Sequence, residues 1–395
     1  MFRNRMSVVV ALSALAFCLP LVCHGASGVT PESDSNDAIV IRNTSHSANS
    51  ALKKAVAYLV AQQSEDGYFG EHPEIGFTGL AVAALAKSPF RNEPAVKPAI
   101  EKGVKRLLSQ QKANGSFAGD DLRSLDNYRT AISIMALVAV DPASYADQIE
   151  KAQKFLITMQ MGPHNGADKD RDKNFYGGFR YDEEKGRADM SNTQMALQAL
   201  NDSGLDPDSE VWKRAVVFLN RCQNRSESND TGHAANDGGG IYAPNETKVK
   251  NGTVTLPDGR IVYKSYGSMT YALLKCFIFA GVSKDDPRVQ AAYDWIASHY
   301  TVEENPGLGQ QGLYYYYNTM ASTLAIYNSP RIKSSESKQY DWADDLVERL
   351  VALQREDGSW TNENDRWMEG SPVLVTAYAS LALESALSVI APVTD

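Results

Sequence analysis

Hydrophobic positions along the chain define two alternating kinds of helical segment. One kind is apolar on a single face, as in Leu52, Val56 and Leu59, which recur at helical spacing with lysines between them. The other kind begins at a threonine, as at Thr78, and continues with small and apolar residues on every side. A helix that is apolar all round is buried. The pattern therefore predicts pairs of one outer, half-wet helix and one inner, buried helix.

The pair occurs six times. Each outer segment is followed by a Gln, a glycine turn and an aromatic residue. The clear copies are Gln63–Gly67–Phe69, Gln111–Gly115–Phe117 and Gln354–Gly358–Trp360, and the looser ones are Gln160 with Gly177 and Phe179, Gln223 with Gly240 and Tyr242, and Gly312 with Tyr314. The inner segments begin near Thr78, Thr130, Thr193, Thr270, Thr319 and Thr376. Because such pairs bury every inner helix when they close on themselves, we expect an all-α fold, an (α/α)6 toroid over residues 51–391.

The glycine turns all join an outer helix to an inner one, so they lie at one end of the ring. Long connections are usually functional or disordered, and the long ones, residues 161–188, 224–264 and 302–317, fall at this same end. We therefore expect any functional site at the amino-terminal ends of the inner helices.

The amino terminus has the three parts of a secretory signal. Arg3 and Arg5 precede an apolar run over residues 8–22, and Gly25 and Ala26 offer a cleavage site. We expect a signal peptide at residues 1–26, export to the periplasm or outside the cell, and a flexible polar lead-in over residues 27–50. Retention as an uncleaved membrane anchor is the alternative; after cleavage no transmembrane span is expected.

Removing the signal changes the charge and the cysteine count. The formal charge of −9 becomes −11, and four cysteines become two. The acidic balance argues against nucleic acid as a partner. Cys222 and Cys276 do not form a disulfide framework, and Cys276 occupies the small-residue position of the repeat, where Ala84 and Ala136 stand in the first two copies. We expect two isolated thiols.

The repeat resembles that of terpenoid cyclases and protein prenyltransferases, the superfamily of the prenyltransferase and squalene oxidase repeat. The shared features are the Gln354, Gly358 and Trp360 element, the turn at residues 177–179 and the Ser-Asn-Thr-Gln entry at residues 191–194. The resemblance implies a squalene-cyclase-like toroid whose central cavity binds or transforms a prenyl or polycyclic lipid.

The chemistry of the superfamily is not matched. Its cyclases protonate an alkene with an Asp-x-Asp-Asp-Thr-Ala motif; Thr130 and Ala131 match the end of this motif and Asp126 its first residue, but Tyr128 and Arg129 replace the acids. Its protein prenyltransferases use zinc held by Asp, Cys and His, and no Asp-x-Cys occurs here. Catalytic competence is therefore doubtful, and we expect no metal and no cofactor.

Polar residues still gather at the inner-helix entries. The candidate catalytic residues are Asp126, Asp189 and Glu369, for which backbone capping is the alternative role. The candidate binding residues are Tyr128, Arg129, Asn192, Tyr266, Tyr271, Tyr317, Asn318 and Trp367. Arg129 is expected to pair with Asp126 or Asp189, or to hold an anion.

Three functions remain open. A lipid-binding or lipid-transforming toroid predicts an aromatic, largely apolar cavity. A carbohydrate-active enzyme predicts two carboxylates facing one another across the mouth at about 5 to 10 Å, or a Tyr-Arg pair beside an acid. A non-catalytic scaffold or binding module predicts capped acids and a filled centre. The sequence leaves a protein partner and the substrate open.

Overall fold

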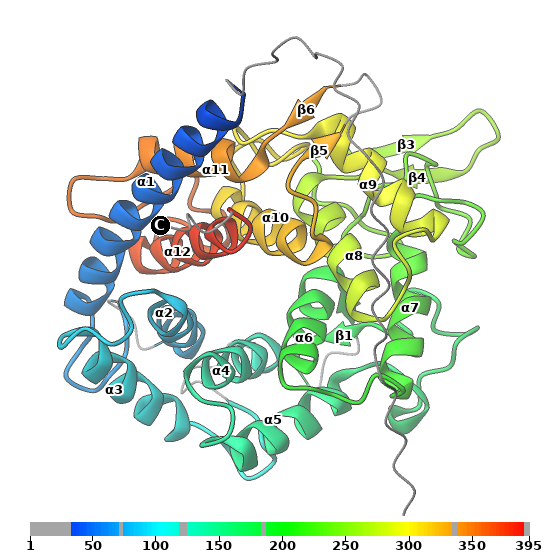
Figure 1. The fold of residues 1–395 in the computed structure, drawn as a ribbon. Coiled ribbons are helices and arrows are strands. Elements are labelled where there is room, and N and C mark those ends of the chain that lie inside the picture. Colours follow the sequence, from blue (N-terminus) through cyan, green and yellow to red (C-terminus); the bar gives the residue numbers. More distant parts are fainter. Residues whose placement is uncertain (1–32, 71–73, 118–124, 183–186, 334–337, 391–395) are drawn as a thin grey trace, which may run out of the picture.

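The computed structural model describes residues 33–70, 74–117, 125–182, 187–333 and 338–390, with side chains from residue 43 onward. Within these residues twelve α-helices form two concentric rings (Figure 1). The inner ring consists of α2 (Ile75–Lys87), α4 (Asp126–Val140), α6 (Met190–Asp202), α8 (Gly267–Phe279), α10 (Leu313–Tyr327) and α12 (Pro372–Leu387). The outer ring consists of α1 (Ser33–Ala61), α3 (Val96–Leu108), α5 (Ala146–Met159), α7 (Glu210–Cys222), α9 (Pro287–His299) and α11 (Trp342–Leu353). The predicted (α/α)6 toroid is confirmed.

The inner ring is closed by packing between its first and last members. Each inner helix packs against the next one along the chain, and α12 returns to pack against α2. Residues 75–86 of α2 are all buried. In α3, by contrast, burial is confined to one face that includes Val96, Ile100 and Val104. The two kinds of hydrophobic pattern therefore correspond to the two rings.

The repeated Gln joins neighbouring outer helices. Gln63 donates from its side-chain amide to the carbonyl of Ala99 in α3 at 2.9 Å, and also to the carbonyl of its own turn glycine, Gly67. Gln111, Gln160 and Gln223 make the same two kinds of bond to α5, α7 and α9. Gln354 bonds to Ala51 of α1 at 2.9 Å and so joins the last repeat to the first. We call this arrangement the glutamine clamp.

The turn glycine and the inner-helix threonine complete the clamp. The turn glycines have φ between +81° and +92°, as at Gly115, where a Cβ atom would lie 2.2 Å from the carbonyl oxygen of Lys151. Only glycine combines this backbone conformation with so close an approach. The hydroxyl of Thr130 accepts a hydrogen bond from the backbone N–H of Phe117 at 3.0 Å, and Thr78, Thr193, Thr270 and Thr376 act alike.

Two of the looser repeats differ from the sequence prediction. In the fourth repeat Gln223 bonds to Gly238, and the position of the aromatic residue is taken by Gly240, whose N–H donates to Thr270. The turn is thus two residues earlier than predicted. In the fifth repeat Gly312 is the N-cap residue of α10 in the left-handed region, so the helix begins inside the predicted connection at 302–317.

The chain ends also differ in part. The signal segment and residues 27–32 lie outside the described residues. Helix α1 begins at Ser33, so residues 33–50, predicted to be a flexible lead-in, form its first half. No helix in the described part of the chain is both long and apolar enough to cross a membrane.

Within the described residues, three short antiparallel strand pairs lie in connections between the helices of the ring. They pair β1 (Phe179–Arg180) with β2 (Ala188–Asp189), β3 (Thr253–Thr255) with β4 (Ile261–Tyr263), and β5 (Ile332–Lys333) with β6 (Gln339–Tyr340). The first two lie in the long connections before α6 and α8. Residues Val254 and Ile261 of the second hairpin are exposed.

Candidate functional site

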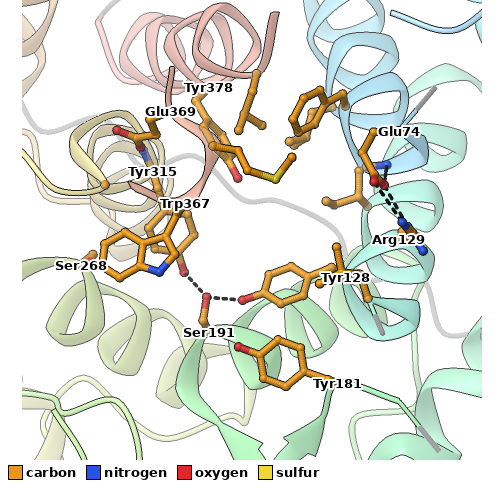
Figure 2. Close-up of a pocket in the computed structure, with 18 of the residues that line it drawn as sticks. Glu74, Tyr128, Arg129, Tyr181, Ser191, Ser268, Tyr315, Trp367, Glu369 and Tyr378 are labelled. Atoms are coloured by element: carbon orange, nitrogen blue, oxygen red, sulfur yellow. Dashed lines mark hydrogen bonds and ion pairs between the residues drawn. The ribbon is translucent and has the colours of Figure 1, made fainter. Parts of the chain in front are cut away.

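A cavity opens inside the ring at the amino-terminal ends of the inner helices (Figure 2). We call it the loop-end cavity; its volume is ≈ 260 Å³. Its wall is mainly apolar and aromatic: Phe77, Leu80, Leu125, Tyr128, Ile132, Tyr181, Tyr242, Tyr266, Met269, Tyr315, Trp367, Met368, Leu374 and Tyr378. The polar lining side chains are Glu74, Arg129, Ser191, Ser268, Asn305 and Glu369. The site lies at the predicted end of the ring.

Glu369 lines the cavity but is used as a helix cap. Its Oε1 accepts a hydrogen bond from the backbone N–H of Tyr315 in the first turn of α10 at 2.8 Å, and its Oε2 accepts one from the amide of Asn362 at 2.7 Å. Burial raises the pKa of this carboxyl, while the bond from Tyr315 favours the charged form. The carboxyl therefore holds a helix start in place.

Asp189 has the same role at α6 and lies behind the wall. It is the N-cap residue, and its Oδ1 accepts from the backbone N–H of Asn192 at 2.9 Å while its Oδ2 accepts from the Asn192 amide at 3.0 Å. Burial raises its pKa, and bonds from Asn192, Tyr242 and Tyr181 oppose that rise. Asn192 in turn accepts from the amide of Asn127 at 2.8 Å, which ties α6 to α4.

Neutral side chains cap two further inner helices. Asn305, wholly buried in the connection before α10, accepts at its Oδ1 from the backbone N–H of Ser268 in α8 at 3.0 Å. Ser371 caps α12 through the N–H of Leu374. The polar side chains at these inner-helix entries therefore satisfy free backbone N–H groups before they are available to a ligand.

A buried ion pair spans the first two inner helices. Glu74 is the N-cap residue of α2, and Arg129 donates to its two carboxylate oxygens from Nε at 2.8 Å and from Nη2 at 2.9 Å. Both side chains are at most 5% exposed. The predicted pairing of Arg129 was with Asp126 or Asp189; the structure pairs it bidentately with Glu74 instead, because the α2 entry lies beside α4.

Hydrogen bonds between tyrosine and serine hydroxyls connect different walls of the cavity. Tyr128 donates to the Ser191 hydroxyl at 2.7 Å, Ser191 and Tyr315 are 3.2 Å apart, and Tyr315 donates to Gln194 Oε1 at 3.0 Å (Figure 2). Burial raises the pKa of Tyr128 and of Tyr315. These phenols therefore remain protonated and act as hydrogen-bond donors at neutral pH.

A second pair of tyrosines connects the wall to Asp189. The hydroxyls of Tyr181 and Tyr242 are 2.7 Å apart. Burial, with a further contribution from the Asp189 carboxyl, raises the pKa of Tyr181 to about 12. These two hydroxyls therefore link Asp189 to the cavity wall.

A strained loop covers part of the mouth. Trp367 and Met368 have φ of +58° and +68°, a conformation that non-glycine residues adopt at a cost of about 1–3 kcal/mol each. Trp367 is 46% exposed, packs on Gly312, and has the Arg366 guanidinium 4.4 Å from its ring centre. An exposed aromatic ring held in this way forms a firm edge to the cavity.

The predicted site residues separate into two groups. Tyr128, Arg129, Tyr266, Trp367 and Glu369 line the loop-end cavity. The other candidates do not line it. Asp126 is the first, half-buried residue of α4, and Asp189 and Asn192 are buried behind the wall. Tyr271 packs on Tyr316, Tyr317 donates to the Val302 carbonyl, and Asn318 lines a second cavity at the far end of the ring.

Several lining residues were missed by the sequence analysis. Glu74 and Tyr378 lie four residues before and two residues after a repeat threonine, so the repeat register gives a signal for their place near an inner-helix entry. Tyr315 is the member of the tyrosine run that lines the cavity, whereas the sequence analysis chose Tyr317. Tyr181 and Tyr242 lie in long connections, where no periodic pattern places a side chain.

Two cysteines, Cys222 and Cys276, lie in the described part of the chain, and both are buried. Cys222 and Cys276 are free thiols, and burial raises the pKa of Cys276 to about 12. Within the described ranges no group of three His, Cys, Asp or Glu side chains could hold a metal ion.

Solved structures share the fold of this chain. The type II terpene cyclase MstE from Scytonema matches with a TM-score of 0.55 at 15% identity, over 87% of this chain and 98% of that one. The same enzyme in complex with geranylgeranyl dihydroxybenzoate matches at 0.53 and 13%, over 89% and 99%. The GH76A alpha-1,6-mannanase from Salegentibacter sp. HEL1_6 matches at 0.58 and 10%, over 87% and 100%. At these identities the likeness concerns the fold alone.

Sequence comparison gives the family. No curated protein matches the chain significantly. Residues 124–393, more than half of the chain, match the model of the squalene-hopene cyclase C-terminal domain. With the closed double ring and the glutamine clamps, this match establishes that the chain belongs to the family of the squalene-hopene cyclase C-terminal domain.

Proposed function

We propose that the protein binds a prenyl or polycyclic lipid in the loop-end cavity. The observation that carries the proposal is the wall, in which side chains from all six inner helices and their connections, most of them apolar or aromatic, surround an open space. Burying a hydrocarbon there gains about 25 cal/mol for each Å² removed from water. Few polar groups in the wall would be left without partners by such a ligand.

We further propose that binding is the function and that the alkene is not protonated. Protonation needs an acid that can release its proton into the cavity. Among the described residues two carboxyl groups line it, Glu74 and Glu369, and they are held by Arg129 and by the backbone of α10. The absence of the cyclase acid motif from the sequence agrees with this arrangement.

The mouth favours a ligand with an acidic or oxygen-rich end. Lys248 stands 3.9 Å from the ring centre of Tyr242, and the charges of Arg187 and Arg366 act on its pKa, so three cations gather at this edge. Glu246 pairs with two of them, Arg187 and Lys248. Arg366, which lies over the Trp367 ring at the cavity edge, would attract the polar end of an amphiphile outward.

Export agrees with this proposal but is inferred from the sequence alone. An exported lipid-binding protein would meet its ligand in the periplasm or at the cell exterior. The alternative of an uncleaved membrane anchor would keep the cavity close to a lipid source.

The proposal is tested with the purified mature chain and geranylgeraniol or squalene. After gel filtration, mass spectrometry should find the lipid bound and unchanged. Leu125→Trp, which places a large ring in the cavity wall, should reduce retention at least tenfold. Val351→Trp, on the exposed face of α11, is the matched control and should retain the lipid.

A carbohydrate-active enzyme is the second candidate. Glu74 and Glu369 lie on opposite sides of the cavity (Figure 2), and Tyr128 and Arg129 lie beside the first of them. Incubation with alpha-1,6-mannan tests this candidate. Release of sugar without lipid retention would replace the proposed function, and a cyclised lipid would show that the ring is catalytic.

A further inference from the structure

A second cavity lies at the opposite end of the ring. Five inner helices, α2, α4, α6, α10 and α12, line it with residues from their middle and carboxyl-terminal turns, and its volume is ≈ 280 Å³. It shares Leu80 and Ile132 with the loop-end cavity, so the two follow one another along the ring axis. We call it the far-end cavity.

Glu384 of α12 presents an unsatisfied carboxyl to this space. Both of its oxygens are buried, and neither has a hydrogen-bond partner within the described part of the chain. Leaving such a buried group unpaired destabilises the folded state, and more so if it is charged. Burial accordingly raises the pKa of Glu384 well above its usual range. Such a group is a strong indication of an absent partner.

The surroundings favour a cation as that partner. Glu384 stands in the last turn of α12, where the free carbonyl groups carry partial negative charge. Two lysines face this region: Lys87 stands at the exposed edge, and Lys275 is engaged with Gln198 Oε1 at 2.8 Å and Ser322 Oγ at 3.1 Å. The structure places neither within hydrogen-bond distance of the Glu384 oxygens. An anion would be repelled by the Glu384 carboxylate, and an alcohol would supply only one hydrogen-bond donor to its two oxygens.

The remaining wall limits the size and polarity of the ligand. Met135, Met195 and Leu381 contribute apolar surface, and Asn318 contributes an amide. The hydroxyls of Ser322, Ser385 and Ser388 also line the cavity, but each already donates its proton to a backbone carbonyl. A ligand must therefore combine one cationic end with a short apolar body.

We propose that the far-end cavity binds a protonated alkylamine, with its ammonium group on the Glu384 carboxylate and its alkyl chain against Met135, Met195 and Leu381. Binding requires the carboxyl to be ionised, so the Glu384 proton passes to the solvent as the ammonium enters. The ammonium supplies up to three donors to oxygens that have none. This site is separate from the lipid proposed for the loop-end cavity.

The test is calorimetric titration of the full mature chain with n-hexylamine at pH 8. The wild type should bind one equivalent, and titrations in two buffers of different ionisation enthalpy should show proton release. Glu384→Gln should weaken binding at least tenfold. Glu348→Gln, on the exposed face of α11, is the matched control and should bind as the wild type does. Hexan-1-ol should bind the wild type at least tenfold more weakly than the amine.

Three results would overturn the proposal: no binding of hexylamine to the folded wild type, equal affinity in folded Glu384→Gln, or equal affinity for hexan-1-ol. Circular dichroism and thermal unfolding establish that each variant is folded. Leu125→Trp separates this proposal from the lipid proposal, because it should reduce lipid retention at least tenfold and leave amine binding unchanged.

Discussion

The two cavities along the ring axis differ in how their acidic side chains are satisfied. At the loop end, Glu74 and Glu369 meet a guanidinium or backbone N–H groups, and Asp189 caps α6 behind the wall. At the far end, both oxygens of Glu384 lack a partner in the described structure. Two of the three predicted catalytic acids, Asp189 and Glu369, therefore hold helix starts, while Glu384, in an apolar helix end, has no hydrogen-bond partner in the described structure.

This contrast has a physical origin in helix geometry. Amino-terminal helix ends present free N–H groups, which recruit carboxylates as caps. Carboxyl-terminal ends present free carbonyl groups and repel them. A carboxyl group near the carboxyl end of a helix lowers stability, so it is a stronger indication of a ligand site than a carboxyl group that caps an amino-terminal helix end.

The largest expected effect concerns the loop end. Arg129→Met leaves the Glu74 carboxylate buried without its cation, which should lower the free energy of unfolding by about 4 kcal/mol. Urea denaturation measures the loss. Lys154→Met, which breaks the exposed pair with Glu150, should cost less than about 1 kcal/mol. A loss for Arg129→Met as small as this control would break the comparison, because Glu74 would then be available for chemistry.

A smaller, pH-dependent effect is expected at the far end. Burial lowers the pKa of Lys275 to about 8, from 10.5 in the unfolded chain. The folded state therefore loses its proton first, so the contribution of Lys275 to stability is present above pH 10.5 and is lost as the pH falls to 8. The difference corresponds to about 3 kcal/mol.

Comparison with Lys275→Met isolates this contribution. The stability of the variant relative to the wild type should fall by about 3 kcal/mol between pH 7 and pH 10.5, as measured by denaturant unfolding. Lys151→Met, on the exposed face of α5, should show no such trend. A flat difference for Lys275→Met would mean that its ammonium group is solvated.

The smallest effect concerns the clamp that closes the ring. Gln354→Ala leaves the carbonyl groups of Ala51 and Gly358 without their donor, which should cost about 2 kcal/mol. Gln290→Ala removes an exposed hydrogen bond and should cost less than about 0.5 kcal/mol. Equal thermal unfolding of the two variants would show that the loop end does not depend on its clamps.

The fold could be predicted because the same residue types make the same contacts in each repeat. A threonine, a turn glycine and a Gln recur because each makes a fixed bond or a close approach in every copy, as Thr130, Gly115 and Gln111 do. The prediction was wrong at Gly240 and Tyr242, where a long connection shifts the turn to Gly238. It was also wrong for residues 33–50, because a polar composition does not exclude a helix that packs on its neighbours.

The site was less predictable because lining a cavity depends on rotation about a helix axis. Tyr315 and Tyr317 share one helix and one residue type, yet only Tyr315 lines the loop-end cavity. Arg129 pairs with Glu74, 55 residues away in the chain, and local spacing gives no indication of such a partner. Glu384 has no sequence signal beyond its place in an apolar segment.

The bond from Gln354 to Ala51 joins residues 303 positions apart. When this bond forms during folding, an open row of helix pairs becomes a closed ring. Its entropic cost grows only with the logarithm of that separation, so closure is compatible with a long chain. Among the described helices α12 follows all the others in the chain and packs against both α1 and α2, so the ring can close only after the other five pairs have been synthesised. Until that helix emerges, the apolar faces of the first pair stay uncovered, which makes the nascent chain the state most exposed to misassembly.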